Sequence, residues 1–234
     1  MKDNIDNKQI GNRKFIIELR FEHKIILLDK RGAIVNEIMQ SKLFPDCQWE
    51  IGNAEIIIRD NKIKEEARNV ILINPSGINF SSTKIDSVDN FYSRFEKIRT
   101  IIVNVLGELN IKRIGCRIIG TYKVKSKDFD SILTRFKESF PMQFYIDKYP
   151  VKDLLFHLNY QNGMYEIGPI NHNDDFFKRE FIFSDHVDHI GVAIDTDNYL
   201  TNEISTINDK SLIKDIFILS LSVEKDLYSN LQDF

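Results

Sequence analysis

Alternation of apolar and polar residues predicts strands through much of the first half of the chain. It is clearest in KFIIELRFE, residues 14 to 22, where every second side chain is apolar, as in a strand with one buried face. Residues 48 to 60 also have an extended pattern. The segments NVILI and INFSS are joined by NPSG, which favours a turn between two strands.

The second half of the chain is also predicted to contain several strands. DLLFHLNYQ and MYEIGPI flank Asn162-Gly163, which is the strongest short signal for a β-hairpin. FFKREFIF, residues 176 to 183, and HIGVAIDTDNY, residues 189 to 199, are predicted to be two further strands. Between the halves, RIGCRIIGTYKVKSK, residues 113 to 127, is predicted to be a strand with apolar residues on one side and cations on the other.

Apolar residues at spacings of three and four predict four helices. The clearest covers residues 87 to 109, with Ser87 or Asp86 as its N-cap. Its apolar residues are Phe91, Phe95, Ile98, Ile102, Val105 and Leu109. Shorter helices are predicted at 33 to 44 and 128 to 140, and a closing helix at 211 to 231 follows Asp209 as a cap.

The order of these elements predicts an α+β fold of two units, each an antiparallel sheet with a long helix packed on one face. We expect residues 1–12 to be a disordered arm and residues 13–126 to be the first α+β domain. Residues 127–150 are expected to be a connecting helix and linker, and residues 151–234 the second α+β domain.

Composition narrows the class of protein. The chain has 234 residues with 42% hydrophobic content, enough for one large core or two small ones, and its net charge of −3 excludes a globally basic nucleic-acid binder. Its two cysteines, Cys47 and Cys116, form no CxxC motif, so we expect both to be reduced. With no signal peptide and no apolar run long enough to cross a membrane, the sequence predicts a cytoplasmic protein without membrane contact.

The cationic side of residues 113–127 is the first candidate site. Its members are Arg113, Arg117, Lys123, Lys125 and Lys127. Alternate residues of a strand lie about 6.6–7 Å apart, close to the phosphate repeat of a nucleic acid, so these cations are candidate phosphate contacts. The alternatives are pairing with acids such as Glu18 and Glu22 across the sheet, or protection of an edge strand by lysines. We expect the two arginines to be paired and the three lysines to be the better binding candidates.

The second candidate site is SDHVDHIGVAIDTD, residues 184 to 197. Asp185, His186, His189, Asp195 and Asp197 are residue types that ligate zinc or manganese. The spacing does not favour a metal site, because His186 and His189 lie three residues apart where a turn runs into a strand and do not share a face. The alternative is a polar turn followed by a strand whose exposed end carries aspartates.

Other catalytic patterns are missing from the sequence. Pro45-Asp46 followed by Glu55 is a loose match to a nuclease core, but Ile57 stands where that core needs a lysine. The sequence has no GxSxG, GxGxxG or GxxxxGK[ST] motif, and His157 lies in a predicted hairpin strand where a structural role is the ordinary one. The abundant phenylalanines fall at core positions. The sequence therefore favours a protein that is not an enzyme and has no cofactor.

KFIIELRFE, KRIGCRIIGTY and AIDTDNY follow one another in an order that resembles a sporadically distributed family of uncharacterised bacterial proteins of about this length. The resemblance implies no activity, cofactor or catalytic residue, and its patchy distribution implies mobile or antiviral defence genes. We therefore expect a non-catalytic accessory component of a bacterial multi-protein system, acting in antiphage defence through contact with a partner protein. The alternatives are a nucleic-acid-binding module that uses residues 113–127 and a metal-dependent hydrolase that uses residues 185–197.

Overall fold

The computed structural model describes residues 5–44, 46–84, 86–140, 152–172, 174–182, 190–201 and 209–234. Its elements in chain order are β1 (Ile10–Phe21), α1 (Leu27–Gln40), β2 (Gln48–Ile51), β3 (Ile56–Arg59), a 3-10 turn η1 (Lys64–Glu66), β4 (Asn69–Asn74), β5 (Gly77–Ser82), α2 (Val88–Leu106), β6 (Ile111–Tyr122), α3 (Phe129–Ser139), β7 (Phe156–Tyr160), β8 (Gly163–Ile170), α4 (Asp175–Glu180), β9 (Gly191–Leu200) and α5 (Asp209–Leu231).

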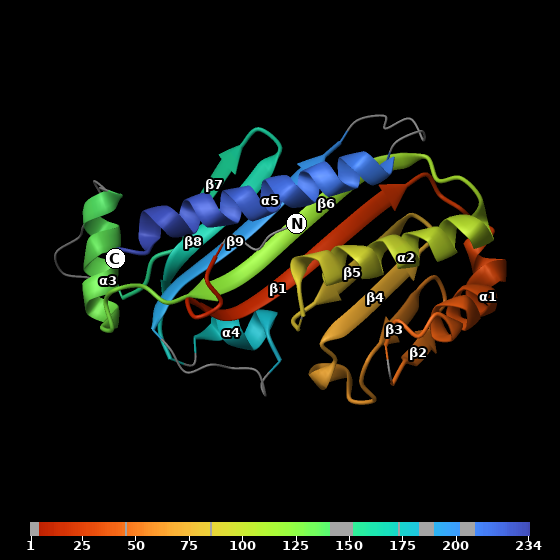
Figure 1. The fold of residues 1–234 in the computed structure, drawn as a ribbon, viewed down its shortest axis with the longest axis horizontal. Coiled ribbons are helices and arrows are strands. Elements are labelled where there is room, and N and C mark those ends of the chain that lie inside the picture. Colours follow the sequence, from red (N-terminus) through yellow and green to blue (C-terminus); the bar gives the residue numbers. More distant parts are fainter. Residues whose placement is uncertain are drawn as a thin grey trace.

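The strands form one antiparallel sheet in the order β2-β3-β4-β5-β1-β6-β9-β8-β7. The two longest strands, β1 and β6, lie side by side at its centre (Figure 1) and pair from Ile10–Tyr122 to Phe21–Ile111. This confirms the α+β class, but the structure has one continuous sheet where the sequence predicts two. Pairing of β6 with β9 joins the two predicted units, and it satisfies backbone groups that would otherwise be left at the edges of two smaller sheets.

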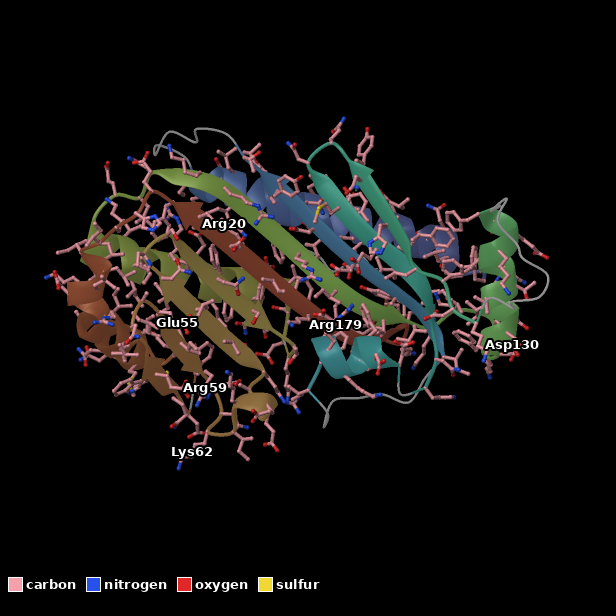
Figure 2. The ribbon with its side chains drawn as sticks, turned by 180° about the vertical axis from the view of Figure 1, so that it is seen from behind. Arg20, Glu55, Arg59, Lys62, Asp130 and Arg179 are labelled. Carbon is pink, nitrogen blue, oxygen red and sulfur yellow. The ribbon has the colours of Figure 1, made fainter. Side chains whose placement is uncertain are left out.

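The helices divide unequally between the two faces of the sheet. In Figure 1, α2 and α5 lie across one face with α1 beside α2, and the short helix α4 lies on the other face, which is turned toward the viewer in Figure 2. The main hydrophobic core fills the space between the sheet and α1, α2 and α5. A second cluster lies around α3 and the end of α5, and a third lies under α4.

The predicted long helix is present as α2. The side-chain oxygen of Ser87 accepts a hydrogen bond of 3.1 Å from the backbone N–H of Asn90, which confirms this residue as the N-cap. The helix ends at Gly107, whose φ of 77° lies in the region that glycine adopts most easily. Phe91, which packs against the rings of Phe15 and Phe80, fixes α2 to the sheet.

One predicted strand is a helix. Residues 176–183 were expected to be extended, but α4 covers Asp175–Glu180. The side chain of Asp174 accepts a hydrogen bond of 2.8 Å from the backbone N–H of Phe176, which begins a helical turn. Phe177 and Phe181 then fall four residues apart and both are buried against the sheet. The spacing of its aromatic residues therefore determines the secondary structure of this segment more than the β-forming preference of its residue types does.

Several predicted boundaries also move. Residues 48–60 form the β2–β3 hairpin, and β6 ends at Tyr122, so residues 123–127 lie beyond the strand. In the expected disordered arm, β1 already begins at Ile10 and the side chain of Ile5 is buried. Helix α1 begins at Leu27, six residues before its predicted start. The part of the expected linker after residue 140, residues 141–150, lies outside the described residues.

Helix α5 is fixed to the sheet by polar side chains as well as apolar ones. The single O–H of Ser220 is shared between the carbonyl oxygens of Cys116 and Ile216, at 3.1 and 3.0 Å, and Glu224 accepts a hydrogen bond from the hydroxyl of Tyr122. One turn further, Tyr228 donates a hydrogen bond of 3.0 Å to the carbonyl oxygen of Lys123. These three side chains stand on the face of α5 that meets β6, so they set its rotation and its position along the strand.

Candidate binding surface

The face of the sheet opposite α2 and α5 carries most of the polar residues of the central strands, and we call it the open face. Alternation along the paired strands places on it Lys14, Ile16, Glu18, Arg20, Asn79, Ser81, Arg113, Gly115, Arg117, Ile119, Asp195, Asp197 and Tyr199. Figure 2 shows that α4 crosses one end of this face and that, among the described residues, no long helix crosses the rest; Arg20 is labelled on it. Antiparallel sheets commonly bury one face and leave the other in water.

Arg113 is at the centre of a charged network on the open face. Its Nη1 donates to the carboxylate of Glu18 from the neighbouring strand β1, and its Nη2 donates to Asp197 of β9 at 3.1 Å. The guanidinium also lies over the ring of Tyr199, 4.9 Å from its centre. Arg20 Nε contacts the other oxygen of Glu18 at 3.1 Å. Arg113 therefore bridges carboxylates on both of its neighbouring strands.

Arg117, four residues along β6 on the same face, forms a second set of ion pairs. Its Nε donates to both carboxylate oxygens of Asp195, at 2.9 and 3.2 Å, and its Nη2 lies 2.5 Å from Oδ2. The same nitrogen is 4.0 Å from Glu180 of α4, which Lys14 approaches to 3.5 Å. This network therefore ties α4 to the sheet through charge as well as through its buried phenylalanines.

A shallow cavity of about 230 Å³ lies on the open face between these charged side chains. It is lined by Ile16, Glu18, Arg20, Asn79, Arg113, Gly115, Arg117 and Asp197. Gly115 makes room for the network, because a Cβ at this position would lie 2.6 Å from Nη1 of Arg113. A side chain there would push the guanidinium away from Glu18 and Asp197.

Burial changes the ionisation of the carboxylates in this network. The pKa of Asp195 is raised above its ordinary value because the residue is almost fully buried, and the neighbouring guanidinium of Arg117 acts in the opposite direction. The pKa of Asp197 is also raised, chiefly by partial burial, although the guanidinium of Arg113 lowers it. The pKa of Arg117 is raised by its hydrogen bonds to Asp195, so this guanidinium stays charged.

The structure brings together residues that the sequence placed in two different candidate sites. Arg113 and Arg117, expected as phosphate contacts or paired residues, are paired with Asp197 and Asp195, expected as metal ligands. Glu18 is confirmed as a partner of Arg113. Glu22 was also expected to pair with these arginines, but it contacts Lys112 and Asn110.

The three lysines of the first candidate site lie apart from the arginines. Lys123, Lys125 and Lys127 follow the end of β6 and are exposed. The backbone N–H of Lys125 donates to Gln232, and its Nζ lies 2.6 Å from a carboxylate oxygen of Asp233. This segment therefore runs beside the end of the chain and does not extend the open face.

For the metal hypothesis, Asp185, His186 and His189 lie outside the described residues. Within the described ranges, no group of three or more His, Cys, Asp or Glu side chains is arranged to hold a metal ion.

His157 is exposed, with Nδ1 3.2 Å from a carboxylate oxygen of Glu166 on the neighbouring strand. Among the described residues, no helix is both long and apolar enough to cross a bilayer.

Comparison with models of known protein families and with curated proteins finds no match to this chain. Its function must therefore be inferred from its own geometry. The sequence did contain one signal for the open face, the alternating cations of β6. It contained no signal that β1 and β9 would lie on either side of β6, and so it did not identify Asp195 and Asp197 as partners of those cations.

Proposed function

We propose that this chain is a non-catalytic binding protein that contacts a partner protein through the open face. The observation that carries the proposal is the charge-paired network around Arg113 and Arg117, which lies on a sheet face that the long helices leave uncovered. The antiphage defence setting implied by the family resemblance is the biological context that we propose for this contact.

The chemistry of the open face fits a protein partner better than a nucleic acid. Arginine and tyrosine are enriched at protein interfaces, and both are present here as Arg113 stacked on Tyr199. The ion pairs hold the guanidinium groups in place before binding, which lowers the entropy lost when a partner docks. A phosphate backbone requires a surplus of positive charge, but these arginines face Glu18, Asp195 and Asp197.

The test uses Arg20, whose side chain is 60% exposed at the edge of the network. Arg20→Glu reverses the charge on the open face and leaves Arg113 and Arg117 with their main partners. Lys214→Glu is the matched control, because Lys214 is an exposed cation on α5, on the other face of the sheet. Partner proteins captured from the native host by the wild type and by both variants are identified by mass spectrometry, and their affinities are then measured with purified components.

We expect Arg20→Glu to weaken binding of the partner by about tenfold or more, since arginines carry a large share of the binding energy of protein interfaces. Lys214→Glu is expected to bind like the wild type. If both variants retain the same partner with unchanged affinity, the open face is not the binding surface. If the wild type captures no specific partner, the proposed function itself fails.

A further inference from the structure

The edge strand β7, although only five residues long, lacks several of the features that normally stop an edge from pairing. It stands last in the sheet and, among the described residues, pairs with β8 alone. Its sequence, FHLNY, contains no lysine and no proline, and its pairing with β8 has no bulge. Natural edge strands usually carry such features because their unpaired N–H and C=O groups can recruit another strand.

Two apolar side chains are exposed along this edge. Leu158 is 37% exposed and Tyr160 is 65% exposed. Both alternate with His157 and Asn159, and they share a side of the sheet with Phe156. The ring of Phe156 stacks on Phe136 and lies tilted against Phe140, both of the α3 region. Figure 1 shows the β7–β8 hairpin extending past α5, so this part of the sheet lacks the helix cover that buries β6 and β9.

The backbone groups at the outer edge can be assigned from the hairpin. Tyr160 pairs with Gly163 across a two-residue loop, and such a loop is closed by a hydrogen-bonded pair. Since the direction of the N–H and C=O groups alternates, Leu158 also faces β8, and His157 and Asn159 face outward. Two N–H groups and two C=O groups therefore line the outer edge.

We propose that β7 pairs antiparallel with β7 of a second copy of this chain, in a register centred on Leu158. His157 of each copy then lies opposite Asn159 of the other, and their outward backbone groups form four hydrogen bonds across the edge. Leu158 lies opposite its own counterpart, and Phe156 lies opposite Tyr160. The result is an isologous dimer in which the sheets of both copies become continuous.

The strand that pairs with β7 is assigned to a second copy of this chain because β7 is complementary to itself. In this register apolar side chains meet apolar side chains on one face, and His157 meets an uncharged asparagine on the other, so no like charges oppose each other. The proposal goes beyond the proposed function, because it concerns the sheet edge and not the open face. Arg20→Glu therefore leaves the dimer intact, and the changes below leave the open face intact.

The test is a cross-link that depends on the register. In a non-hydrogen-bonded pair the two Cα atoms lie about 4.5 Å apart, within the range of a disulfide. In a Cys47→Ser background, which removes the partly exposed native thiol, Leu158→Cys is expected to form a disulfide-linked dimer on mild oxidation. Met164→Cys is the control, because Met164 is 51% exposed but stands on β8 and has no counterpart opposite it.

Two further variants test the edge without a cross-link. Asn159→Pro removes one outward N–H and keeps the bonds between β7 and β8, and Leu158→Lys places two like charges opposite each other. Both are expected to convert the dimer into a monomer in light scattering after size exclusion, with circular dichroism confirming that the chain remains folded.

Three results would overturn the proposal: a wild type that is monomeric at every concentration tested, a dimer that survives both variants, or equal cross-linking through residues 158 and 164. A monomeric wild type that instead captures an extended strand of another protein at β7 also counts against it.

Discussion

Arg13, near the start of the chain, and Glu224, near its end, form a buried ion pair that joins the central strand β1 to helix α5. The Nε of Arg13 donates a hydrogen bond of 2.7 Å to Oε1 of Glu224, and its Nη2 contacts Oε2. Their side chains are 7% and 0% exposed. The guanidinium also lies 4.6 Å from the centre of the Phe15 ring. The contact between β1 and α5 therefore depends on two opposite charges that are buried together.

Replacing Glu224 by leucine is expected to destabilise the protein by about 3–5 kcal/mol, because it leaves the Arg13 guanidinium buried with its carboxylate partner removed. Urea unfolding followed by circular dichroism measures the change. The triple variant Arg13→Met, Tyr122→Phe, Glu224→Leu removes these three polar side chains together, and it should recover most of the loss, since an apolar replacement of a buried pair is often neutral. Equal stabilities for Glu224→Leu and the wild type would contradict this account.

Gly120 makes room for the ring of Tyr122 beside the same buried ion pair. The ring of Tyr122 folds back over Gly120 to reach Glu224, and a Cβ on Gly120 would lie 2.0 Å from the tyrosine hydroxyl. Since Tyr122 is fully buried, it has no free space to move into. Gly120→Ala is therefore expected to cost about 1–3 kcal/mol or more.

Gly32→Ala is the matched control for this substitution, measured in the same unfolding experiment. Gly32 lies within α1, and a Cβ there would meet no atom within 4 Å. Alanine is the better helix former, so this variant should be unchanged or more stable by up to about 1 kcal/mol. Similar losses for both variants would mean that the contact with Tyr122 does not decide the cost at Gly120.

The local pattern of apolar and polar residues was sufficient to predict most of the strands and helices. This is because the apolar residues of each buried face recur with the period of the strand or helix that carries them. The 87–109 periodicity corresponds to α2, and NPSG corresponds to the β4–β5 turn. The failures have physical causes. In FFKREFIF the β-forming residue types predict a strand, but the N-cap at Asp174 and the four-residue spacing of Phe177 and Phe181 favour α4.

The candidate site was less predictable than the fold because it depends on which strands are neighbours. Arg113 could be assigned to one face of a strand from its own sequence, but its partners come from β1 and β9, far away along the chain. The β7–β8 hairpin was predicted, but its two loop residues are Gln161 and Asn162, one position before the predicted Asn162-Gly163. The exposure of Leu158 and Tyr160 was not predicted, since it depends on where α5 lies across the sheet.

Cys116 should be chemically inert in the folded protein. It is 1% exposed, and burial raises the pKa of its thiol well above the ordinary value, so the reactive thiolate is suppressed. With iodoacetamide at pH 8, peptide mass spectrometry is expected to find Cys116 unmodified in the native chain and modified after unfolding. Cys47, which is partly exposed, is the internal control and should react sooner. Alkylation of native Cys116 at the rate of the unfolded chain would show that the β6–α5 contact opens readily.

The pairing of arginines on the open face predicts weak affinity for nucleic acids. Arg113 and Arg117 are neutralised by Glu18, Asp195 and Asp197, which leaves the exposed lysines at 123, 125 and 127 beside the acidic Asp233. Fluorescence anisotropy with a labelled duplex should therefore show no binding at physiological salt, whereas a true phosphate-binding surface loses affinity steeply as salt rises. The variant with Lys123→Glu and Lys127→Glu controls for the lysine segment. Binding by the wild type that is steep in salt and abolished in this variant would contradict the prediction and assign the nucleic-acid contact to residues 123–127.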